Sequence, residues 1–445
     1  MNRVFGLFAA AVIAALPLAG SAQTAAPPAA PAEQKVTITP YGFILAQAFW
    51  ANGPFGTKDY PGQVLTNGDG GSFLISARGS RFGFRIAVPD DPFTGAKLSG
   101  VIEADFKAGH IPGTTPACTT TGTTVTCTSL AANSNAWYNG VMRLRLAYAQ
   151  ATWGGPDLAV KLVAGQDWSI VAPVNGTSLA WGYDPIFYQA GNLWRRAPQA
   201  KVTVESSGPV GFSVAAAATS PADLQVTTVP AGNTDYGVGN RSRTPGWEGR
   251  AAVAWRQGKT KVAEVGVSGA MQKRRYSVTA ASINSFNDIT VKLGVVDAAF
   301  NLPYVSIQGE GFLNDGYTDA YQGIEATGGN PAQSSQFPVA AIGATGYNIG
   351  SKGFFAEATL KPLPYVWIPV GYGVEQLKYD RNTLGIAATT RTKGAQFHTG
   401  LLLNMTNAWQ FGGEWTRTMS GYGKTGQTQI TKTADMFAAV SKLNF

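Results

Sequence analysis

The chain closes with Ser441-Lys442-Leu443-Asn444-Phe445, the end of an alternating segment that decides the fold class. One face of this segment carries Phe437, Ala439, Ser441, Leu443 and Phe445, and the other carries Ala438, Val440, Lys442 and Asn444. Successive side chains of a β-strand point to opposite faces. The period of two therefore predicts a strand whose last residue is aromatic.

A chain that ends in this way resembles the bacterial outer-membrane β-barrels. In that class the last strand closes the barrel, and the terminal Phe lies in the aromatic girdle on the periplasmic side. The resemblance implies an all-β membrane barrel rather than a soluble enzyme.

The N-terminus has the pattern of a secretory signal. Arg3 supplies a positive charge, residues 4–18 form an apolar run, and Gly20-Ser21-Ala22 are small residues suited to cleavage. We expect a signal peptide over 1–22, an Ala/Pro-rich linker over 23–34 and the barrel over 35–445. The apolar run is shorter than the roughly 20 residues of a spanning helix. The exported chain would then enter a membrane only as a closed barrel.

Composition supports strands and excludes several functions. Charged residues are 13% of the chain and Gly occurs 54 times, which suits strands joined by turns. The formal charge of +8 is dispersed along the chain, so it favours anionic partners weakly and gives no indication of nucleic-acid binding. We find no glycine-rich phosphate loop, haem motif or metal-ligand spacing, and we expect no cofactor and no metal.

Alternating segments predict a sixteen-stranded antiparallel transmembrane β-barrel. The candidate strands lie near 36–50, 72–87, 97–107, 141–153, 158–166, 199–206, 210–219, 246–256, 261–272, 288–300, 304–313, 352–361, 365–378, 394–404, 408–418 and 431–445. An even number of strands places both termini of the barrel on one side of the membrane, which we expect to be the periplasmic side.

The connections between these strands alternate in length. Short ones, such as 154–157 and 301–303, are rich in Gly, Pro, Asp or Asn. Long ones are 51–71, 108–140, 167–198, 220–245, 273–287, 314–351, 379–393 and 419–430. Short periplasmic turns and long outer loops are typical of outer-membrane barrels. Aromatic residues beside the short turns predict one girdle, formed by Trp153, Trp255, Tyr304, Trp367, Trp409 and Phe445.

Charged residues gather on the second, third and fourth strands. Arg81 and Arg85 alternate with Phe82 and Phe84. Glu103 and Asp105 follow on the next strand, and Arg143 and Arg145 on the one after it. Adjacent strands would assemble these six residues on one wall of the lumen, where permanently charged guanidinium groups favour anions over cations. Alternatively, the six charges pair with one another and only hold the wall together.

Four stretches of this region, SRFGFR (80–85), GVIEADF (100–106), RLRLAYAQATW (143–153) and LVAGQDWS (162–169), resemble the DcaP-like family of trimeric outer-membrane porins. The resemblance covers roughly residues 70–200. It implies a homotrimeric passive diffusion channel in the outer membrane that prefers small anions such as dicarboxylates. The N-terminal coiled coil found in that family has no counterpart here.

The segment 167–198 follows the fifth strand, where porins fold a loop into the pore. We expect it to be the constriction loop, with Arg195 or Arg196 reaching the lumen beside Asp167 and Asp184. The alternative is an ordinary surface loop.

Two further features lie in predicted loops. Cys118 and Cys127 occupy one Thr-rich segment of an exported chain, which predicts a disulfide. The cluster Lys273-Arg274-Arg275 would bind lipopolysaccharide phosphates, unless it is simply a solvated loop base.

Two other functions stay open. One is a plugged structural or adhesive barrel that binds partners through its long loops, especially 314–351. The other is a barrel hydrolase, for which His398 is the candidate histidine because His110 lies in a loop. A hydrolase would need a serine and a histidine that cooperate, and no serine motif accompanies either histidine. We expect no enzymatic activity.

Overall fold

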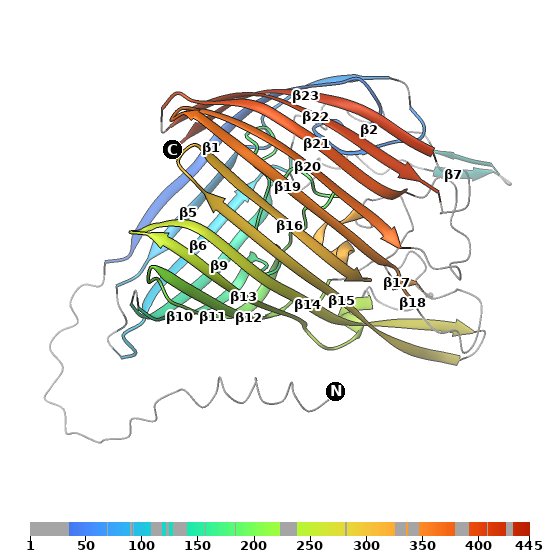
Figure 1. Cartoon of the computed structure of the whole chain (residues 1–445). Helices are drawn as coiled ribbons and strands as arrows, with labels where there is room; N and C mark the ends of the chain where they lie inside the picture. Colours follow the sequence, from blue (N-terminus) through green and yellow to red (C-terminus); the bar gives the residue numbers. More distant parts are fainter. Residues whose placement is uncertain are drawn as a thin grey trace, which may run out of the picture. The chain divides into compact units, whose positions relative to one another are not determined.

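A computed structural model shows a closed antiparallel β-barrel (Figure 1). It describes residues 35–445 except 69, 90, 92, 108–117, 122–123, 128–139, 156, 183, 223–237, 281–282, 325–334, 337–346, 379–390, 407 and 424–429. The proposed signal peptide and linker, and His110, lie outside the described residues. No helix in the described part of the chain is long and apolar enough to cross a bilayer.

The barrel sheet contains 17 strand segments, and two of them, β4 and β5, are successive halves of one strand, so sixteen strands form the wall. They are β1 (Thr37–Ala51), β4 (Ser72–Ser76) with β5 (Arg81–Ala87), β6 (Lys97–Asp105), β9 (Arg143–Gly154), β10 (Ala159–Trp168), β11 (Arg196–Glu205), β12 (Val210–Thr219), β13 (Gly246–Gln257), β14 (Thr260–Ala280), β15 (Ile283–Asn301), β16 (Val305–Asp315), β19 (Gly350–Leu363), β20 (Val366–Lys378), β21 (Arg391–Asn404), β22 (Trp409–Tyr422) and β23 (Ile430–Asn444). The predicted fold class is confirmed.

Smaller elements lie in the connections. They are the hairpins β2 (Phe55–Thr57) with β3 (Tyr60–Val64), β7 (Cys118–Thr121) with β8 (Thr124–Cys127) and β17 (Ser335–Gln336) with β18 (Tyr347–Asn348), the helix α2 (Val238–Arg241) and the 3₁₀ turn η2 (Thr318–Tyr321). The short turns and the C-terminus share one end of the barrel, which we call the short-turn end, and β7, β17 and β18 lie at the other, which we call the outer end (Figure 1).

The C-terminal strand closes the barrel against the first strand. β1 and β23 pair from Phe43 opposite Asn444 to Ala51 opposite Met436. Beyond this ladder, the Gly42 N–H donates to the Phe445 carbonyl at 3.0 Å and the Phe445 N–H donates to the Gly42 carbonyl at 3.1 Å. Closure leaves no unpaired sheet edge, which a hydrocarbon environment cannot tolerate.

The two faces of β23 differ as the alternation predicts. Phe437 and Leu443 point outward and are 46% and 44% exposed, whereas Ala438 and Val440 point inward and are 4% and 5% exposed. An apolar exposed face and a covered inner face invert the usual arrangement of a soluble barrel, and this inversion is what a lipid environment requires.

Trp255, Tyr304, Trp409 and Phe445 are exposed beside the short turns, as expected of a girdle. Trp367 is an exception and corrects the prediction. It stands opposite Leu402, which is buried inside the barrel, and its ring lies 5.6 Å from the Lys361 ammonium. Trp367 therefore faces the lumen, because it occupies one of the alternate positions of β20 whose side chains point inward.

The predicted strand 72–87 is interrupted over residues 77–80. The Ser80 hydroxyl accepts the Leu45 N–H at 2.9 Å and donates to the Ala77 carbonyl at 2.7 Å. This side chain takes the place of a ladder partner for β1 and ends β4. The alternation of hydrophobic residues did not reveal the interruption.

The predicted loop 273–287 is largely strand, because β14 and β15 continue as one long hairpin in which Ala280 stands opposite Ile283. The cluster Lys273-Arg274-Arg275 is therefore split between two faces. Arg274 is fully buried and donates to the Gly316 carbonyl at 3.1 Å, whereas Arg275 pairs with Asp288 at 2.7 Å on the outward face. The three side chains do not form the single cluster that we expected.

Gly42 lies where the first strand meets the C-terminal residue, and the site has no room for a side chain. A Cβ atom at Gly42 would lie 2.3 Å from the Arg81 carbonyl oxygen and 2.9 Å from the Phe445 ring. We predict that Gly42→Val lowers the free energy of unfolding by about 2 kcal/mol or more. The measurement is urea unfolding of the refolded barrel, followed by the heat-dependent shift of its electrophoretic mobility.

Gly249→Val is the matched control, since a Cβ atom on that β13 glycine meets nothing within 4 Å. Equal unfolding midpoints for the two variants would contradict the role of the Gly42–Phe445 contact in closure.

Candidate functional site

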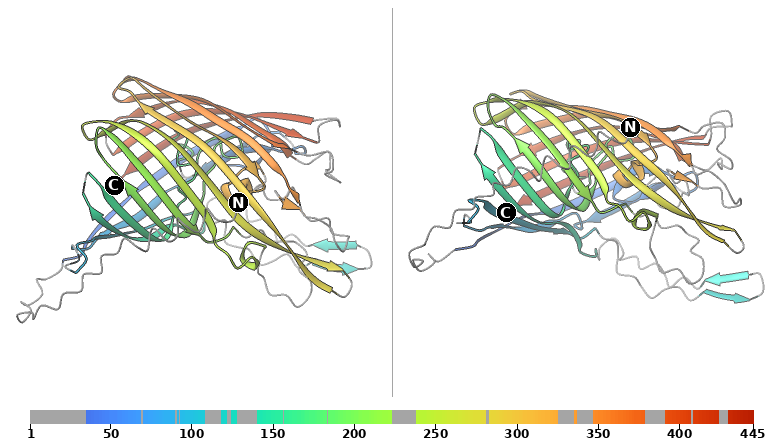
Figure 2. Two further views of the ribbon diagram at one scale, coloured as in Figure 1. Left: turned by 60° about the horizontal axis from the view of Figure 1, so that its bottom comes forward. Right: turned by 90° about the horizontal axis from the view of Figure 1, so that it is seen from below.

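The segment 169–195 lies inside the ring of strands (Figure 2). It contains several fully buried side chains, among them Trp181, Ile186 and Phe187. Irregular backbone inside a barrel leaves N–H groups that need acceptors. The acceptors here are carboxylates on the wall strands, at Glu248, Glu310, Glu357 and Glu414, which we call the wall glutamates.

The wall glutamates hold the segment at its two ends and along its middle. Glu248 on β13 accepts the Ser169 hydroxyl at 2.8 Å and the Ile170 N–H at 3.2 Å. Glu310 on β16 accepts the Leu193 N–H and the Asn192 amide. Both carboxylates are about 95% buried, at 5% and 4% exposed.

The middle of the segment is held by β19 and β22. Glu357 accepts the Thr177 N–H at 2.9 Å. Glu414 accepts the Ser178 hydroxyl at 2.6 Å, the Leu179 N–H at 3.0 Å and the Ala180 N–H at 2.7 Å. Hydrogen bonds to an ionised acceptor are about twice as strong as neutral ones, so these contacts tie the segment firmly to the wall.

A second inward segment, residues 52–71, was not recognised from the sequence. The Tyr60 hydroxyl donates to the Pro185 carbonyl at 2.6 Å, and the Trp181 indole donates to the Asp59 carbonyl at 3.1 Å. Arg391 joins both segments, donating to the Gly62 carbonyl at 2.8 Å and to the Gln189 side chain at 2.9 Å. The first long connection thus folds against the segment 169–195.

A third inward stretch covers residues 317–324 around η2. The Tyr321 hydroxyl donates to Glu248 at 2.8 Å, and the Ile324 N–H donates to Glu375 of β20 at 3.0 Å. Tyr317 and Tyr321 pack with Ile170, Leu193 and the inner faces of β12 and β14–β16. These contacts tie all three inward segments to strands between β13 and β22, while the ion pair of Asp184 with Arg143 also ties the first of them to β9.

The predicted charged residues meet on the opposite wall. Arg143 binds Asp105 with two hydrogen bonds, at 2.9 and 2.7 Å. Arg145 bridges Glu103 and Asp105, each at 2.8 Å. Asp105 and Arg145 are 0% and 1% exposed, so this inner part of the network holds the wall together, as the structural alternative proposed.

A β-bulge explains how both arginines enter this network. The β6–β9 register shifts between Glu103, opposite Leu146, and Ala104, opposite Leu144, which leaves Arg145 as the additional residue. Beyond the bulge Tyr148, opposite Val101, faces the lumen. Alternation counted from Arg143 would place Tyr148 on the outward face, because a bulge reverses the alternation without an obvious signature.

Asp184 of the inward segment connects the remaining arginines. It lies 3.3 Å from Arg143 and 3.6 Å from Arg196, whose guanidinium also stacks near the Trp168 and Trp194 rings. Arg196 is largely buried, with 7% of its side chain exposed. Arg195 is buried with Tyr317 and Tyr321 and donates to the Ser220 carbonyl.

Three cations of the lumen surround two aromatic residues of β1. Arg85 lies 4.1 Å above the Tyr41 ring, while Arg81 and Lys442 lie 5.0 and 4.5 Å from the Phe43 ring. We call these five residues the cation–aromatic wall. Tyr41 also donates to Glu103 at 3.1 Å, which links the wall to the buried network.

Tyr41, Phe43 and Lys442 were missed as site residues. The alternation of β23 already placed Lys442 on the face opposite Phe437 and Leu443. That alternation could have indicated that Lys442 faces the lumen. Its proximity to Arg81 depends on the closure of β1 between β23 and β5, which no local pattern contains.

The charges inside the barrel are distributed unequally. The wall glutamates are covered by the inward segments. Exposed or half-buried cations at Arg85, Lys97, Lys361 and Lys442 form no ion pair within the described part of the chain. Open lumen surface therefore carries an excess of positive charge.

A separate ion-pair cluster anchors the second inward segment. Asp59 is 2.7 Å from Arg78 and 2.9 Å from Lys107. Burial alone would raise the pKa of the Asp59 carboxyl, but the two cations outweigh burial and lower it below its usual value. The carboxylate therefore stays ionised in the folded barrel.

His398 faces the lumen but is fully buried beneath the inward segment, between the Trp181 and Phe187 rings. Its Nδ1 lies 3.0 Å from the Thr416 hydroxyl and its Nε2 lies 3.3 Å from Glu414. This packing accounts for the histidine without a catalytic role.

Cys118 and Cys127 stand at directly opposite register positions of the β7–β8 hairpin, and their disulfide stays a prediction.

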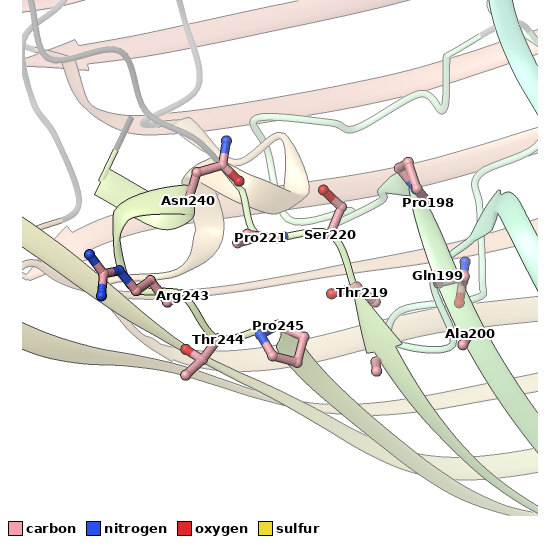
Figure 3. A pocket seen from close by; sticks show the side chains of 11 residues that line it. Pro198, Gln199, Ala200, Thr219, Ser220, Pro221, Asn240, Arg243, Thr244 and Pro245 are labelled. Atoms are coloured by element: carbon pink, nitrogen blue, oxygen red, sulfur yellow. The ribbon is translucent and has the colours of Figure 1, made fainter. Parts of the chain in front are cut away.

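Figure 3 shows a cavity of about 420 Å³ near the outer ends of β11 and β12. Small and uncharged residues line most of it, including Pro198, Thr219 and Pro245. The guanidinium of Arg243 points away from Gln199 (Figure 3). Thr219 and Ser220 of its lining accept hydrogen bonds from Arg195, so the cavity adjoins the arginines at the end of the inward segment.

Comparisons with solved structures place this barrel among porin folds. The outer membrane channel DcaP of Acinetobacter baumannii superimposes with a TM-score of 0.65 at 14% identity, covering 92% of this chain and 97% of that one. An anion-selective porin from Comamonas acidovorans gives 0.50 at 12% identity, covering 92% and 100%. OmpF of Salmonella typhi, in complex with daunomycin, gives 0.50 at 11% identity, covering 92% and 97%. No family model and no curated protein matches the chain.

Glu414, which accepts three hydrogen bonds from residues 178–180, provides a test of how the inward segment is held. Glu414→Ala leaves three donors of residues 178–180 without an acceptor, and we predict a loss of about 3 kcal/mol in the free energy of unfolding. The released segment should also make single-channel currents larger and noisier. The control is Glu205→Ala, whose carboxylate is 29% exposed and pairs with Lys161 at 2.7 Å. Wild-type stability together with wild-type current noise in Glu414→Ala would contradict the anchoring role.

Asp59 predicts an acid dependence of stability. Because its folded pKa is lowered, its contribution is complete above the usual carboxyl pKa of about 4 and is lost as pH falls through the lower folded value. We expect Asp59→Asn to cost about 3 kcal/mol at pH 7 and progressively less towards pH 2. Urea midpoints across this range measure the difference, with the exposed turn variant Asp157→Asn as control. A difference independent of pH would count against the ion-pair cluster.

Proposed function

We propose that this protein is an outer-membrane porin that passes small hydrophilic solutes by passive diffusion and favours anions, dicarboxylates among them. The observation that carries the proposal is the cation–aromatic wall, left open while the wall glutamates are covered. The porin-like fold of the barrel supports a channel, and the charge distribution supports the preference.

The anion preference follows from where unpaired charge lies. A guanidinium or ammonium in a narrow, poorly screened passage lowers the barrier for anions and raises it for cations. Arg85 and Lys442 supply such charge next to Tyr41 and Phe43. Arg81 and Arg143, with 16% and 25% of their side chains exposed, add a second layer beside the inward segment.

The remaining predicted site residues take supporting roles in this proposal. Glu103, Asp105 and Arg145 hold the arginines extended through the buried network. Asp184 orients Arg143 and Arg196 from the inward segment. Arg195 anchors that segment beside Tyr321.

We further propose a homotrimer exported to the outer membrane. The outward face of β1, β22 and β23 supports a contact between barrels, because small residues such as Ala46, Ala48, Gly413 and Ala439 line shallow apolar depressions there. Surfaces of small residues allow close approach of two membrane proteins.

The test is planar-bilayer recording of the purified protein under a KCl gradient. The proposal predicts conductance steps in groups of three and a reversal potential of the sign given by excess chloride flux. No conductance would favour the plugged structural or adhesive barrel. A cation-selective potential would keep the channel and remove the proposed role of the cationic wall.

The wall itself is tested by Arg85→Gln combined with Lys442→Gln. Removing both charges should reduce the chloride-to-potassium permeability ratio by about two- to fivefold, since exposed charges in a pore act through a screened field. The matched control is Lys352→Gln with Lys393→Gln, which removes two exposed charges from the outward face. Unchanged selectivity in the lumen variant would exclude these two cations from the mechanism.

A further inference from the structure

A second cavity, of about 400 Å³, lies at the outer ends of β9, β10 and β11, and we call it the outer cavity. The first and third inward segments meet beside it, where the Trp194 N–H donates to the Tyr321 carbonyl at 3.1 Å. Its lining includes three arginines, Arg143, Arg195 and Arg196, and no acidic residue of the described part of the chain. Small-molecule sites usually have volumes of about 300–1,000 Å³, so the outer cavity is large enough for a small solute.

The outer cavity lies at one end of a row of alternating charges. The members of this row, in order, are Arg81, Glu103, Arg145, Asp105, Arg143, Asp184 and Arg196. The nitrogen–oxygen distances between successive members are 3.5, 2.8, 2.8, 2.7, 3.3 and 3.6 Å. Because an arginine stands at both ends, four cations share three carboxylates. The row therefore carries one positive charge more than its own carboxylates balance, and its last member, Arg196, lines the outer cavity.

Two buried donors of the lining have no hydrogen-bond partner among the described residues. They are the indole Nε1–H of Trp194 and the Nη1 of Arg196. Trp194 is 7% exposed, and 7% of the Arg196 side chain is exposed. The Arg196 guanidinium lies 4.9 Å from the Trp194 ring, so one small group is within reach of both residues. A buried donor without an acceptor is unfavourable, and an anionic group in the outer cavity would supply the acceptor.

Apolar residues form another part of the lining. They are prolines and alanines for the most part, among them Pro198 and Pro221. The third arginine, Arg195, already donates to the Ser220 carbonyl and lies 3.8 Å from Glu248. A second charged group of a solute would therefore be buried without a partner, which is strongly unfavourable. The outer cavity suits a solute with one anionic group and an apolar body.

We propose that the outer cavity binds organic monoanions that combine one carboxylate with an apolar body. The carboxylate accepts hydrogen bonds from Arg196 and Trp194, and the apolar body lies against Pro198 and Pro221. This inference deepens the proposed anion preference. It rests on the proposed function for the passage of the solute, whereas binding itself needs no conduction.

Isothermal titration calorimetry of the detergent-solubilised protein tests this proposal with three probes that share one ring. Cyclohexanecarboxylate carries one charge, cyclohexane-1,4-dicarboxylate carries two, and cyclohexylmethanol carries none. The monoanion should bind roughly tenfold more tightly than either of the other two probes, because only the monoanion satisfies the donors without burying an unpaired charge. Equal binding of the monoanion and the dianion, or no binding of the monoanion, would overturn the proposal.

Two variants of the lining locate the bound probe. Trp194→Phe removes the unpaired N–H and keeps an aromatic ring, and Gln322→Glu places a carboxylate of the same size in the lining. Each should weaken binding of the monoanion roughly tenfold. The matched control is Gln150→Glu, which adds the same charge on β9, outside the cavity, and should bind like the wild type. Wild-type binding by either lining variant would contradict the proposed site.

Bilayer recording of the same wild-type sample under a KCl gradient separates this proposal from the proposed function. An anion-selective channel that does not bind the monoanion would exclude the outer cavity as a site and keep the porin. Binding of the monoanion without any conductance would keep the site and exclude the passive channel.

Discussion

The inward segment depends on one kind of interaction, the hydrogen bond from its backbone N–H groups to carboxylates of the barrel wall. Glu248, Glu310, Glu357 and Glu414 provide these acceptors from four strands around the barrel. A barrel of sixteen strands encloses more space than its own side chains fill. An irregular segment can occupy that space only if its polar backbone is satisfied, and buried carboxylates need such donors in return.

This interaction also determines which surface of the lumen stays open. Covering the wall glutamates removes their side chains from the solute path. The arginines on β5, β9 and β11 are partly neutralised by Glu103, Asp105 and Asp184, but Arg85 and Lys442 keep their charge accessible beside Tyr41 and Phe43. A chain with 34 basic and 26 acidic residues thereby gains a stronger charge asymmetry inside its barrel than its net charge suggests.

Much of the barrel follows from local patterns, and the site follows only in part. The period of two in 437–445 and the alternation of short and long connections predicted the strands and their closure. The same patterns misassigned 273–287, because an exposed hairpin that extends beyond the barrel has the composition of a loop. They also gave no indication of the break at Ser80 or of the bulge beside Arg145, since each depends on a partner from another strand.

Arg81, Arg143, Glu103 and Asp105 were found from sequence because three consecutive strands are neighbours in a meander. Lys442 and Tyr41 were not found, because their proximity to Arg81 arises when the last strand meets the first. The second inward segment was missed for a similar reason. Its buried residues, Tyr60 and Val64, contact residues near 185 and 420, far away in sequence.

Thiol accessibility during conduction tests most directly whether solutes pass along the cation–aromatic wall. In a background with Cys118 and Cys127 replaced by Ser, cysteine would be introduced at Arg85, or at Thr418 beneath the inward segments, where the native side chain is fully buried. The account predicts that a charged methanethiosulfonate reagent changes the current of the Arg85→Cys channel and leaves the Thr418→Cys channel unaffected. Rapid modification at Thr418→Cys with no effect at Arg85→Cys would place the path on the opposite wall and contradict the account.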